Sequence, residues 1–278
     1  MSDTSQPDPA RWAAGYQPKV VALDVDGTLL DWVDHTEVMS REVIRAVQRV
    51  RDAGTHVVIS TGRSLPGVLD AADMLELPGG LAVASNGAVV FDHPPVELVH
   101  TVTFDASAAV TQLLEHVPHA AVAVEEIGAG YRINKPFPDG EIQGEMVLQS
   151  IDELVAEPVT RVIVRCPDQS AEEFAELAEK LGLHGTNYYV GYTAWLDLAP
   201  TGVSKASGLQ VVVDRLGVQA ADVLAIGDGT NDVEMLQWAG RGVAMGQAPL
   251  SVQAVADDVT ETVERDGAVH ELDRWFGR

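Results

Sequence analysis

The feature that most constrains this chain is an apolar run that leads directly into acid and glycine, at 19–30 in KVVALDVDGTLL. Residues 20–23 are continuously apolar and do not alternate with polar ones, which is typical of a strand covered on both faces of a parallel sheet. Such sheets bind ligands just beyond the carboxyl ends of their strands, where Asp24 and Asp26 fall. The run therefore predicts an α/β fold with a site at the end of this strand.

Asp24 and Asp26 are expected to project to the same side, because side chains alternate along an extended chain, and Gly27 then permits a sharp turn. Two carboxylates aimed at one point repel each other unless a cation lies between them or one of them binds a proton. A hard divalent cation such as Mg²⁺ suits oxygen ligands. Taken alone, the stretch would be interpreted as an ordinary Asp-Gly turn after a strand. The motifs in the rest of the chain are needed to choose between this turn and a metal site.

The pattern of a buried strand followed by polar residues recurs along the chain. Strands expected over 55–60, 81–84 and 223–226 lead to STGR, SNGA and GDGTND. The apolar period of 37–53 predicts a helix, so the first two strands form a right-handed crossover unit and lie side by side. Further helices are expected over 64–75, 204–216 and 233–239, a strand over 242–245, a helix over 251–256 and a strand over 259–263.

The polar residues at these strand ends are expected to gather at one edge of one sheet. Each has an ordinary explanation by itself, such as a helix cap for Thr61 or a surface lysine for Lys205. Their joint placement is not explained in that way. The expected cluster comprises Asp24, Asp26, Thr61, Lys205, Asp228 and Asp232.

The middle of the chain, 96–200, has a different order of expected helices and strands and is long enough for a small second domain. Helices are expected over 106–116 and 170–181, and strands over 120–125, 130–134, 161–165 and 187–198. The first domain would then comprise 19–95 and 201–278. Residues 1–18 are expected to be a mobile tail, since they lack the basic start and apolar middle of a signal peptide.

Charge and cysteine content exclude several classes of protein. The chain has 42 acidic and 18 basic residues, and the net charge of −24 opposes binding to nucleic acid or to anionic membranes. No apolar run reaches the ~18 residues of a membrane span. The single cysteine, Cys166, excludes an internal disulfide and fits a reducing compartment. We therefore expect a cytoplasmic protein, and the sequence leaves its oligomeric state open.

These motifs, in this order, resemble those of the haloacid dehalogenase superfamily of phosphohydrolases: DVDGTLL, STGR, the late Lys205, and GDGTND with EML after it. The runs GVAMGQA and DGAV resemble its Cof-type branch. The resemblance covers about 19–272 and implies a Rossmann-like parallel-sheet core with an inserted α+β cap of the kind called C2B. Between Asp24 and Thr61 lie 36 residues, and between Thr61 and Lys205 lie 143, so the cap belongs in the second interval.

The resemblance also implies a role for each motif residue. Asp24 would be the nucleophile that forms an aspartyl phosphate, and Asp26 the general acid and base. The cofactor would be Mg²⁺, held by Asp24, the backbone carbonyl of Asp26, and Asp228. Phosphate-binding positions would be Val25, Thr61, Gly62, Lys205 and Asn231, with Asp232, Arg63 and Asn86 in support.

The expected activity is hydrolysis of small phosphate esters, of which sugar phosphates are the commonest substrates in similar proteins. One alternative is a phosphomutase of the phosphomannomutase type, which shares the aspartyl phosphate and this cap. Another is a non-catalytic phosphate-sensing protein, which would tolerate the loss of Asp24 or Asp26. Both aspartates are present.

Discrimination between substrates is expected to come from the cap. Candidate specificity residues near a glycine turn are Glu125, Glu126, Arg132 and Asn134. The next place to look is an aromatic group that is also typical of a core or covering face: Tyr188, Tyr189, Tyr192 and Trp195.

Overall fold

The structure, a computed structural model, describes residues 17–277 apart from 34–35, 139–140, 167–169, 182–185 and 191–194. The expected N-terminal tail, 1–18, lies outside the described residues except for its last two positions. Across the described part of the chain, no helix is both long enough and apolar enough to span a bilayer.

One of the two main sheets is a five-stranded parallel sheet with the order β16-β15-β14-β1-β4. Strand β1, which lies between β14 and β4, is buried along its whole length, as expected for a strand covered on both faces. The predicted α/β class with a parallel-sheet core is confirmed. The strands are β1 (Val20–Leu23), β4 (His56–Ile59), β14 (Val223–Gly227), β15 (Arg241–Ala244) and β16 (Asp258–Val259).

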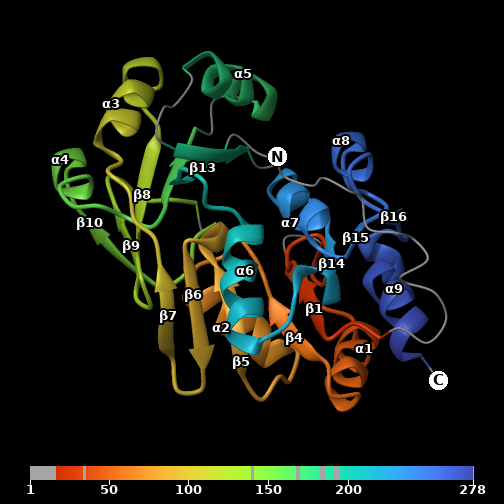
Figure 1. Ribbon diagram of the computed structural model, residues 1–278. Helices are drawn as coiled ribbons and strands as arrows, with labels where there is room; N and C mark the ends of the chain where they lie inside the picture. The colour runs from red at the N-terminus through yellow and green to blue at the C-terminus, as the bar shows by residue number, and fades with distance from the viewer. Residues whose placement is uncertain are drawn as a thin grey trace, which may run out of the picture.

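Helices cover both faces of this sheet (Figure 1). Val21 and Leu23 pack on one side against α1 (Arg41–Asp52), α2 (Leu65–Met74) and α9 (Gly267–Phe276). Val20 and Ala22 pack on the other side against α6 (Lys205–Leu216), α7 (Val233–Trp238) and α8 (Leu250–Gln253). The alternation of β1 thus divides the core between the two helix layers.

The helix α6 begins at a lysine, which the helix dipole does not favour. The side chain of Ser204 caps the helix by accepting a hydrogen bond from the Ser207 N–H, and Gly217 ends it in the left-handed conformation. This N-terminal capping by Ser204 therefore fixes Lys205 at the first position of the helix. A buried cation placed there requires anionic partners nearby.

Two smaller sheets flank the parallel one. β5 (Gly80–Ala84), β6 (Val89–His93) and β7 (Glu97–Thr101) are antiparallel, and an isolated parallel bridge between Ser60 and Val83 joins β5 to the edge of the main sheet. β2 (Asp31–Val33) and β3 (Thr36–Val38) form a hairpin beside the first motif. Because β3 uses 36–38, the helix predicted from 37 begins at Arg41.

A second, six-stranded sheet has the order β10-β9-β8-β11-β13-β12 and is mostly antiparallel. Helices α3 (Ser107–His116), α4 (Ile151–Leu154) and α5 (Ala171–Leu181) pack on one face of it. Its other face carries Tyr131 and Ile163. The strands are β8 (Ala121–Glu126), β9 (Gly130–Ile133), β10 (Glu145–Leu148), β11 (Val162–Arg165), β12 (Thr186–Val190) and β13 (Trp195–Pro200).

Several expected elements are corrected by the structure. The single strand predicted over 187–198 is two antiparallel strands, β12 and β13, because β-forming residues on both sides of Gly191 conceal the break. The strand predicted over 259–263 is reduced to 258–259, and the amphipathic helix α9 that follows was not predicted. The short elements β10 and α4 were also missed, since four residues are too few for a periodic signal.

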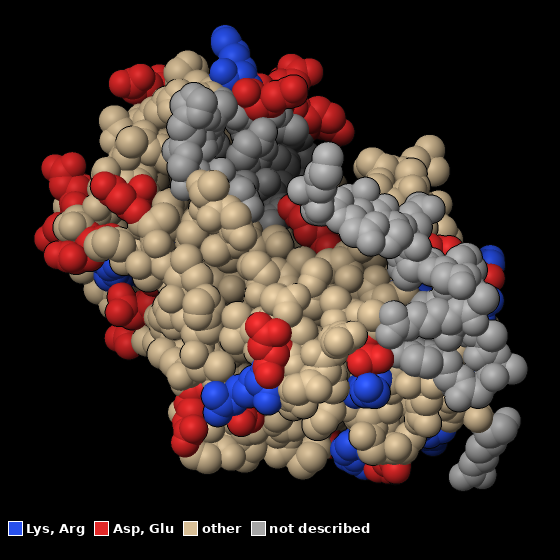
Figure 2. Space-filling view, viewed as in Figure 1, with Lys and Arg blue, Asp and Glu red and all other residues tan. Residues whose placement is uncertain are grey.

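Charged side chains are spread over the surface. On the face shown in Figure 2, acidic side chains lie around the outline of the molecule, while several basic ones lie beside acidic ones near its lower edge. This agrees with an acidity that is distributed along the whole sequence.

Candidate active site

The register of the parallel sheet aligns the ends of three neighbouring strands. Leu23 of β1 lies opposite Ile59 of β4 and Ile226 of β14. The N–H of Asp24 donates to the carbonyl of Ile226 at 3.1 Å, and the N–H of Ser60 donates to the carbonyl of Leu23 at 2.8 Å. The residues that follow these strands, among them Asp24, Thr61 and Asp228, therefore lie at one edge of the sheet.

Lys205 connects two of the aspartates. Its Nζ lies 2.6 Å from Asp24 Oδ1 and 2.6 Å from Asp232 Oδ1, and the residue is fully buried. The second oxygen of Asp232 accepts hydrogen bonds from the N–H groups of Asp228 and Gly229, at 3.0 and 2.9 Å. Asp232 thus ties the lysine to the loop that carries Asp228.

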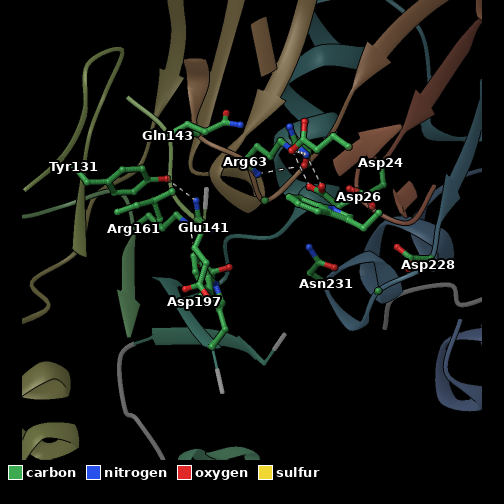
Figure 3. Close-up of a pocket in the computed structure, with 18 residues that line it drawn as sticks. Asp24, Asp26, Arg63, Tyr131, Glu141, Gln143, Arg161, Asp197, Asp228 and Asn231 are labelled. Atoms are coloured by element: carbon green, nitrogen blue, oxygen red, sulfur yellow. Dashed lines mark hydrogen bonds and ion pairs between the residues drawn. The ribbon is translucent and has the colours of Figure 1, made fainter. Parts of the chain in front are cut away.

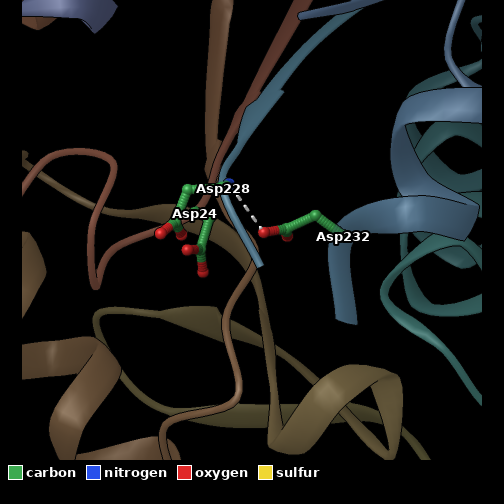
Figure 4. A group of neighbouring side chains, drawn as sticks. All are labelled: Asp24, Asp228 and Asp232. Atoms are coloured by element: carbon green, nitrogen blue, oxygen red, sulfur yellow. Dashed lines mark hydrogen bonds between the residues drawn. The ribbon is translucent and has the colours of Figure 1, made fainter. Parts of the chain in front are cut away.

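Three buried carboxylates, those of Asp24, Asp228 and Asp232, have oxygens that all lie within 4.8 Å of one another (Figure 4). Burial raises the pKa of Asp24 well above its ordinary range, and the charges of Asp232 and Asp228 raise it further, against the effect of Lys205. One ammonium group does not balance three carboxylates, and their oxygens are ligands that a hard divalent cation prefers. Asp24 and Asp228 line the pocket, so they are the pair that can receive an ion from solvent.

Gly27 allows Asp228 to approach the turn after β1. Its φ is +77°, in the left-handed region, and a Cβ placed on it would lie 2.2 Å from Asp228 Oδ2. No other amino acid fits both the conformation and the contact. The glycine of the DVDGT motif is therefore part of the geometry that holds the carboxylate cluster together.

Asp26 lies at the pocket, where Arg63 holds its side chain. Its two oxygens accept hydrogen bonds from Arg63 Nε at 2.8 Å and Nη2 at 2.5 Å, and Nη2 also donates to Glu37 at 2.7 Å. Burial opposes the charge of the guanidinium, but Asp26 and Glu37 together raise the pKa of Arg63 above its ordinary value. Glu37, on β3, was missed because no motif marks it.

The remaining motif residues surround the same end of the pocket. Thr61 is buried, and its Oγ1 accepts a hydrogen bond from the Arg63 N–H at 3.2 Å. Asn231 Nδ2 donates to Asn86 Oδ1 at 2.9 Å, so Asn86 orients the amide of Asn231. Thr61, Gly62 and Asn231 line the pocket, whereas the side chain of Val25 lies in the hydrophobic core.

The pocket, of about 300 Å³, extends from these residues to the second sheet (Figure 3). Arg161 Nε lies 2.6 Å from Asp197 Oδ1, and its Nη1 donates to the hydroxyl of Tyr131 at 3.0 Å. Figure 3 shows this group across the cavity from Asp24 and Asp228. We call this group, together with the other polar or aromatic pocket residues that follow β9 or belong to β13, the far wall: Tyr131, Glu141, Gln143, Arg161, Trp195 and Asp197.

The four expected specificity residues are not among the described residues that line the pocket. Glu125 is buried and accepts hydrogen bonds from Ser85 and Thr160. Glu126 pairs with Arg132 at 3.0 Å, and the side chain of Asn134 bonds the backbone of 120 and 122. These side chains therefore make their contacts within the protein, on or beside the two strands that flank the expected glycine turn.

The far-wall residues could have been found from the alternation of their strands. Asp197 interrupts the mostly apolar strand β13, and Arg161 directly precedes β11, both on the face opposite the helices. A charge at a position of period two marks a face that is not packed against the core. Of the expected aromatic group, Trp195 lines the pocket; Tyr192 and the side chains of Tyr188 and Tyr189 lie outside the described residues.

Comparison with known proteins gives a consistent result. A family model described as haloacid dehalogenase-like hydrolase matches residues 21–272. The chain is 30% identical to a phosphoglycolate phosphatase of Natronomonas pharaonis, over 91% of this chain and 96% of that protein. It is 29% identical to the 5-amino-6-(5-phospho-D-ribitylamino)uracil phosphatase YcsE of Bacillus subtilis, over 92% of this chain and 95% of that protein.

A solved structure shows the same fold. BT1666 of Bacteroides thetaiotaomicron, described among the phosphatases of the HAD superfamily, superposes with a TM-score of 0.76 at 30% identity, and the match covers 96% of this chain and 98% of that one. The similarity thus includes both the parallel sheet and the second sheet.

Proposed function

Because the chain belongs to the family of haloacid dehalogenase-like hydrolases and is a phosphatase of its Cof-type branch, we propose that it is a Mg²⁺-dependent phosphohydrolase of small phosphorylated metabolites. The reaction would pass through an aspartyl phosphate at Asp24. The observation that supports this most strongly is the buried cluster of Asp24, Asp228 and Lys205 at one end of a pocket that also contains Asp26.

In this proposal Asp24 and Asp26 divide the covalent chemistry. A carboxylate oxygen of Asp24 attacks phosphorus, forming the acyl phosphate while the bond from phosphorus to the ester oxygen breaks. Asp26 gives a proton to the departing oxygen. It then takes a proton from the water that attacks the phosphorus of the acyl phosphate, so that phosphate is released and Asp24 is restored.

The remaining cluster residues hold the ion and the phosphoryl group. Mg²⁺ would be held by Asp24, the backbone carbonyl of Asp26, and Asp228, and when bound it would neutralise charge between an anionic nucleophile and an anionic ester. Asp232 would keep Lys205 in place. The phosphoryl oxygens would be bound by Val25, Thr61, Gly62, Lys205 and Asn231, the last oriented by Asn86.

The ion pair of Asp26 with Arg63 adds a condition to this mechanism. Both oxygens of Asp26 accept hydrogen bonds from the guanidinium, so Arg63 must release at least one of them before Asp26 can receive a proton. Asp26 keeps 45% of its side-chain surface exposed, and Arg63 keeps 11%. Asp26 is therefore the partner with room to turn towards a substrate.

We further propose that residues 96–200 form a C2B cap over a core of 19–95 and 201–278. Support comes from the second sheet, which presents a charged face to the pocket and covers its other face with helices. The relatives described above are named for two small phosphate monoesters, and sugar phosphates are the substrate class we propose for this chain.

The test is phosphate release from a panel of sugar, nucleotide and aryl phosphates, with and without Mg²⁺. We expect release of inorganic phosphate that requires the ion. Absence of turnover on every ester with Mg²⁺ present would contradict the proposal. A product that keeps its phosphate at a new position would indicate a phosphomutase instead.

A further inference from the structure

We propose that the enzyme selects phosphate esters whose leaving group is uncharged or cationic, and that it discriminates against esters that carry a second anionic group. This inference rests on the proposed phosphohydrolase function and concerns the far wall of the same pocket. It follows from the charges of the pocket residues and from the way in which they are paired.

The described residues that line the pocket bring an excess of negative charge. They contribute two guanidinium groups, Arg63 and Arg161, against six carboxylates: Asp24, Asp26, Glu37, Glu141, Asp197 and Asp228. The ion-pair partners of these carboxylates and of Lys205 add two cations, Lys205 and Arg165, and one carboxylate, Asp232, so carboxylates still exceed cations. A divalent cation and a phosphoryl dianion bound near Asp24 would approximately cancel each other. The leaving group of the ester therefore experiences the remaining negative charge of the pocket. This charge acts in a partly enclosed site, where charges are screened weakly.

Neither guanidinium group offers unbalanced positive charge to a second anion. Arg161 is 6% exposed and is held by Asp197 and Tyr131, and although burial opposes its charge, Asp197 raises the pKa of Arg161 above its ordinary value. Arg63 is held by two carboxylates. Its Nη1 is buried without a hydrogen-bond partner among the described residues, so it can donate a hydrogen bond but adds no unbalanced charge.

A substrate anion would also have to break an existing ion pair. Glu141 lies 3.0 Å from Arg165 Nε, with 25% and 12% of their side-chain surfaces exposed. Separating a buried or half-buried pair leaves one charge uncompensated, which costs more than an exposed pair contributes. The far wall thus resists an incoming carboxylate or phosphate.

The far wall favours uncharged hydroxyl groups and ammonium groups. The carboxylates of Asp197 and Glu141 can accept hydrogen bonds from hydroxyl groups, and Gln143 can both donate and accept. Trp195 offers an aromatic face, against which the C–H surface of a polyol or an ammonium group can pack. The wall therefore fits a polyol or an amino sugar as the leaving group.

The inference can be tested with two pairs of esters matched in size. Sorbitol 6-phosphate and 6-phosphogluconate differ only in a hydroxymethyl or carboxylate group at the far end, and glucose 6-phosphate and glucosamine 6-phosphate differ in a hydroxyl or ammonium group. Each is measured as a substrate and as a competitive inhibitor of aryl phosphate hydrolysis. We expect kcat/KM, or tightness of inhibition, to favour sorbitol 6-phosphate over 6-phosphogluconate by about tenfold or more. The amino sugar should equal or exceed glucose 6-phosphate.

Equal or better use of 6-phosphogluconate would overturn the inference, and so would equal inhibition by the two esters. A protein that hydrolyses no ester at all, including the aryl phosphate, would instead contradict the proposed function. The two failures are thus distinguishable.

Variants locate the effect on the far wall. Asp197→Asn leaves Arg161 without its carboxylate and should raise the 6-phosphogluconate to sorbitol 6-phosphate ratio by about tenfold. If that variant does not fold, Glu141→Gln, which removes a carboxylate charge that pairs with Arg165 at a half-buried position, should move the ratio in the same direction. Glu145→Gln, an exposed substitution on β10 outside the pocket, is the matched control for the charge change. An unchanged ratio in both folded far-wall variants, or an equal rise in the control, would contradict the assignment.

Discussion

Glu125 of the second sheet accepts hydrogen bonds from Ser85 Oγ through both of its carboxylate oxygens, at 2.7 and 2.6 Å. Thr160 Oγ1 donates to the same carboxylate at 2.8 Å, and all three residues are buried. Ser85 has a positive φ of 51° and directly precedes Asn86, which orients Asn231. Glu125 therefore connects the second sheet to a strained turn beside the proposed phosphate site.

Replacing Glu125 should affect stability more than substrate choice. Glu125→Ala leaves the two hydroxyl groups without their acceptor, and we expect a loss of about 1–3 kcal/mol in the free energy of unfolding. Denaturant unfolding measures this loss, and the ranking of substrates in the panel is the control. A changed ranking at unchanged stability would contradict a connecting role.

The same residue predicts a pH dependence. Burial raises the pKa of Glu125 above its ordinary value of 4.5, although Arg161, Ser85 and Thr160 oppose the shift. The folded state then binds this proton more tightly than the unfolded state, so its contribution is present below pH 4.5 and is lost as pH rises through the folded-state pKa. Glu125→Gln should remove this loss. Its free energy of unfolding relative to wild type should therefore improve between acidic and neutral pH, and a difference that does not change with pH would contradict the prediction.

Gly27→Ala tests the close contact with Asp228. The Cβ of the alanine would lie 2.2 Å from Asp228 Oδ2, and the residue would have to keep a φ of +77°. We expect Mg²⁺ affinity and turnover to fall by at least about tenfold, because ligand geometry is disturbed directly. Isothermal titration measures the affinity.

Gly54→Ala is the matched control, since Gly54 has a φ of +82° but no atom within 4 Å of its would-be Cβ. It should lose stability through backbone strain alone and keep its Mg²⁺ affinity. Equal loss of affinity in both variants would show that strain, and not the contact with Asp228, is responsible.

Lys205→Met should make the folded protein depend on Mg²⁺. The substitution leaves Asp24 and Asp232, which lie close to Asp228, without the buried cation that bonds both of them. Breaking such a pair costs about 3–5 kcal/mol. Added Mg²⁺ would restore part of the balance, so the rise in melting temperature on adding the ion should be larger for the variant than for wild type. A smaller or equal rise would indicate that Lys205 does not offset the charge of this cluster.

Asp26→Asn should slow hydrolysis most for esters with basic leaving groups. Loss of the proton donor matters little for an aryl oxygen and greatly for a sugar alkoxide. We expect kcat/KM, which reports formation of the aspartyl phosphate and not its later hydrolysis, to decrease roughly 10²–10⁴-fold for sugar phosphates and less for an aryl phosphate. Steady-state kinetics on both esters checks this, and an equal decrease on the two would argue against the acid role.

How far the sequence predicted the site depends on how each residue is placed. Asp24, Thr61 and Asp228 were expected together because each follows a buried parallel strand, and neighbouring parallel strands bring their carboxyl ends to one edge. Glu37 was not expected, since its position depends on a short hairpin with no periodic signal.

The far wall was harder to predict for a different reason. Arg161 and Asp197 are 36 positions apart and meet because β11, which follows Arg161, pairs antiparallel with β13. No local signal in the sequence fixes which face of that sheet points at the pocket. The glycine turn near Glu125 attracted attention because exposed polar residues at turns are often functional. In the structure, Glu125 holds Ser85, and the strand residues of the second sheet that line the pocket are Tyr131, Trp195 and Asp197.

The most direct test of the central claim is to trap the aspartyl phosphate. Asp26→Ala should form it rapidly from an aryl phosphate, whose leaving group needs no acid, and hydrolyse it slowly, because the base is absent. After a rapid quench, borohydride reduces an acyl phosphate to the alcohol, so peptide mass spectrometry should find homoserine in place of Asp24 in samples given both substrate and Mg²⁺. A burst of phenolate equal to the enzyme concentration with Asp24 unmodified, or with homoserine at another aspartate, would contradict the account.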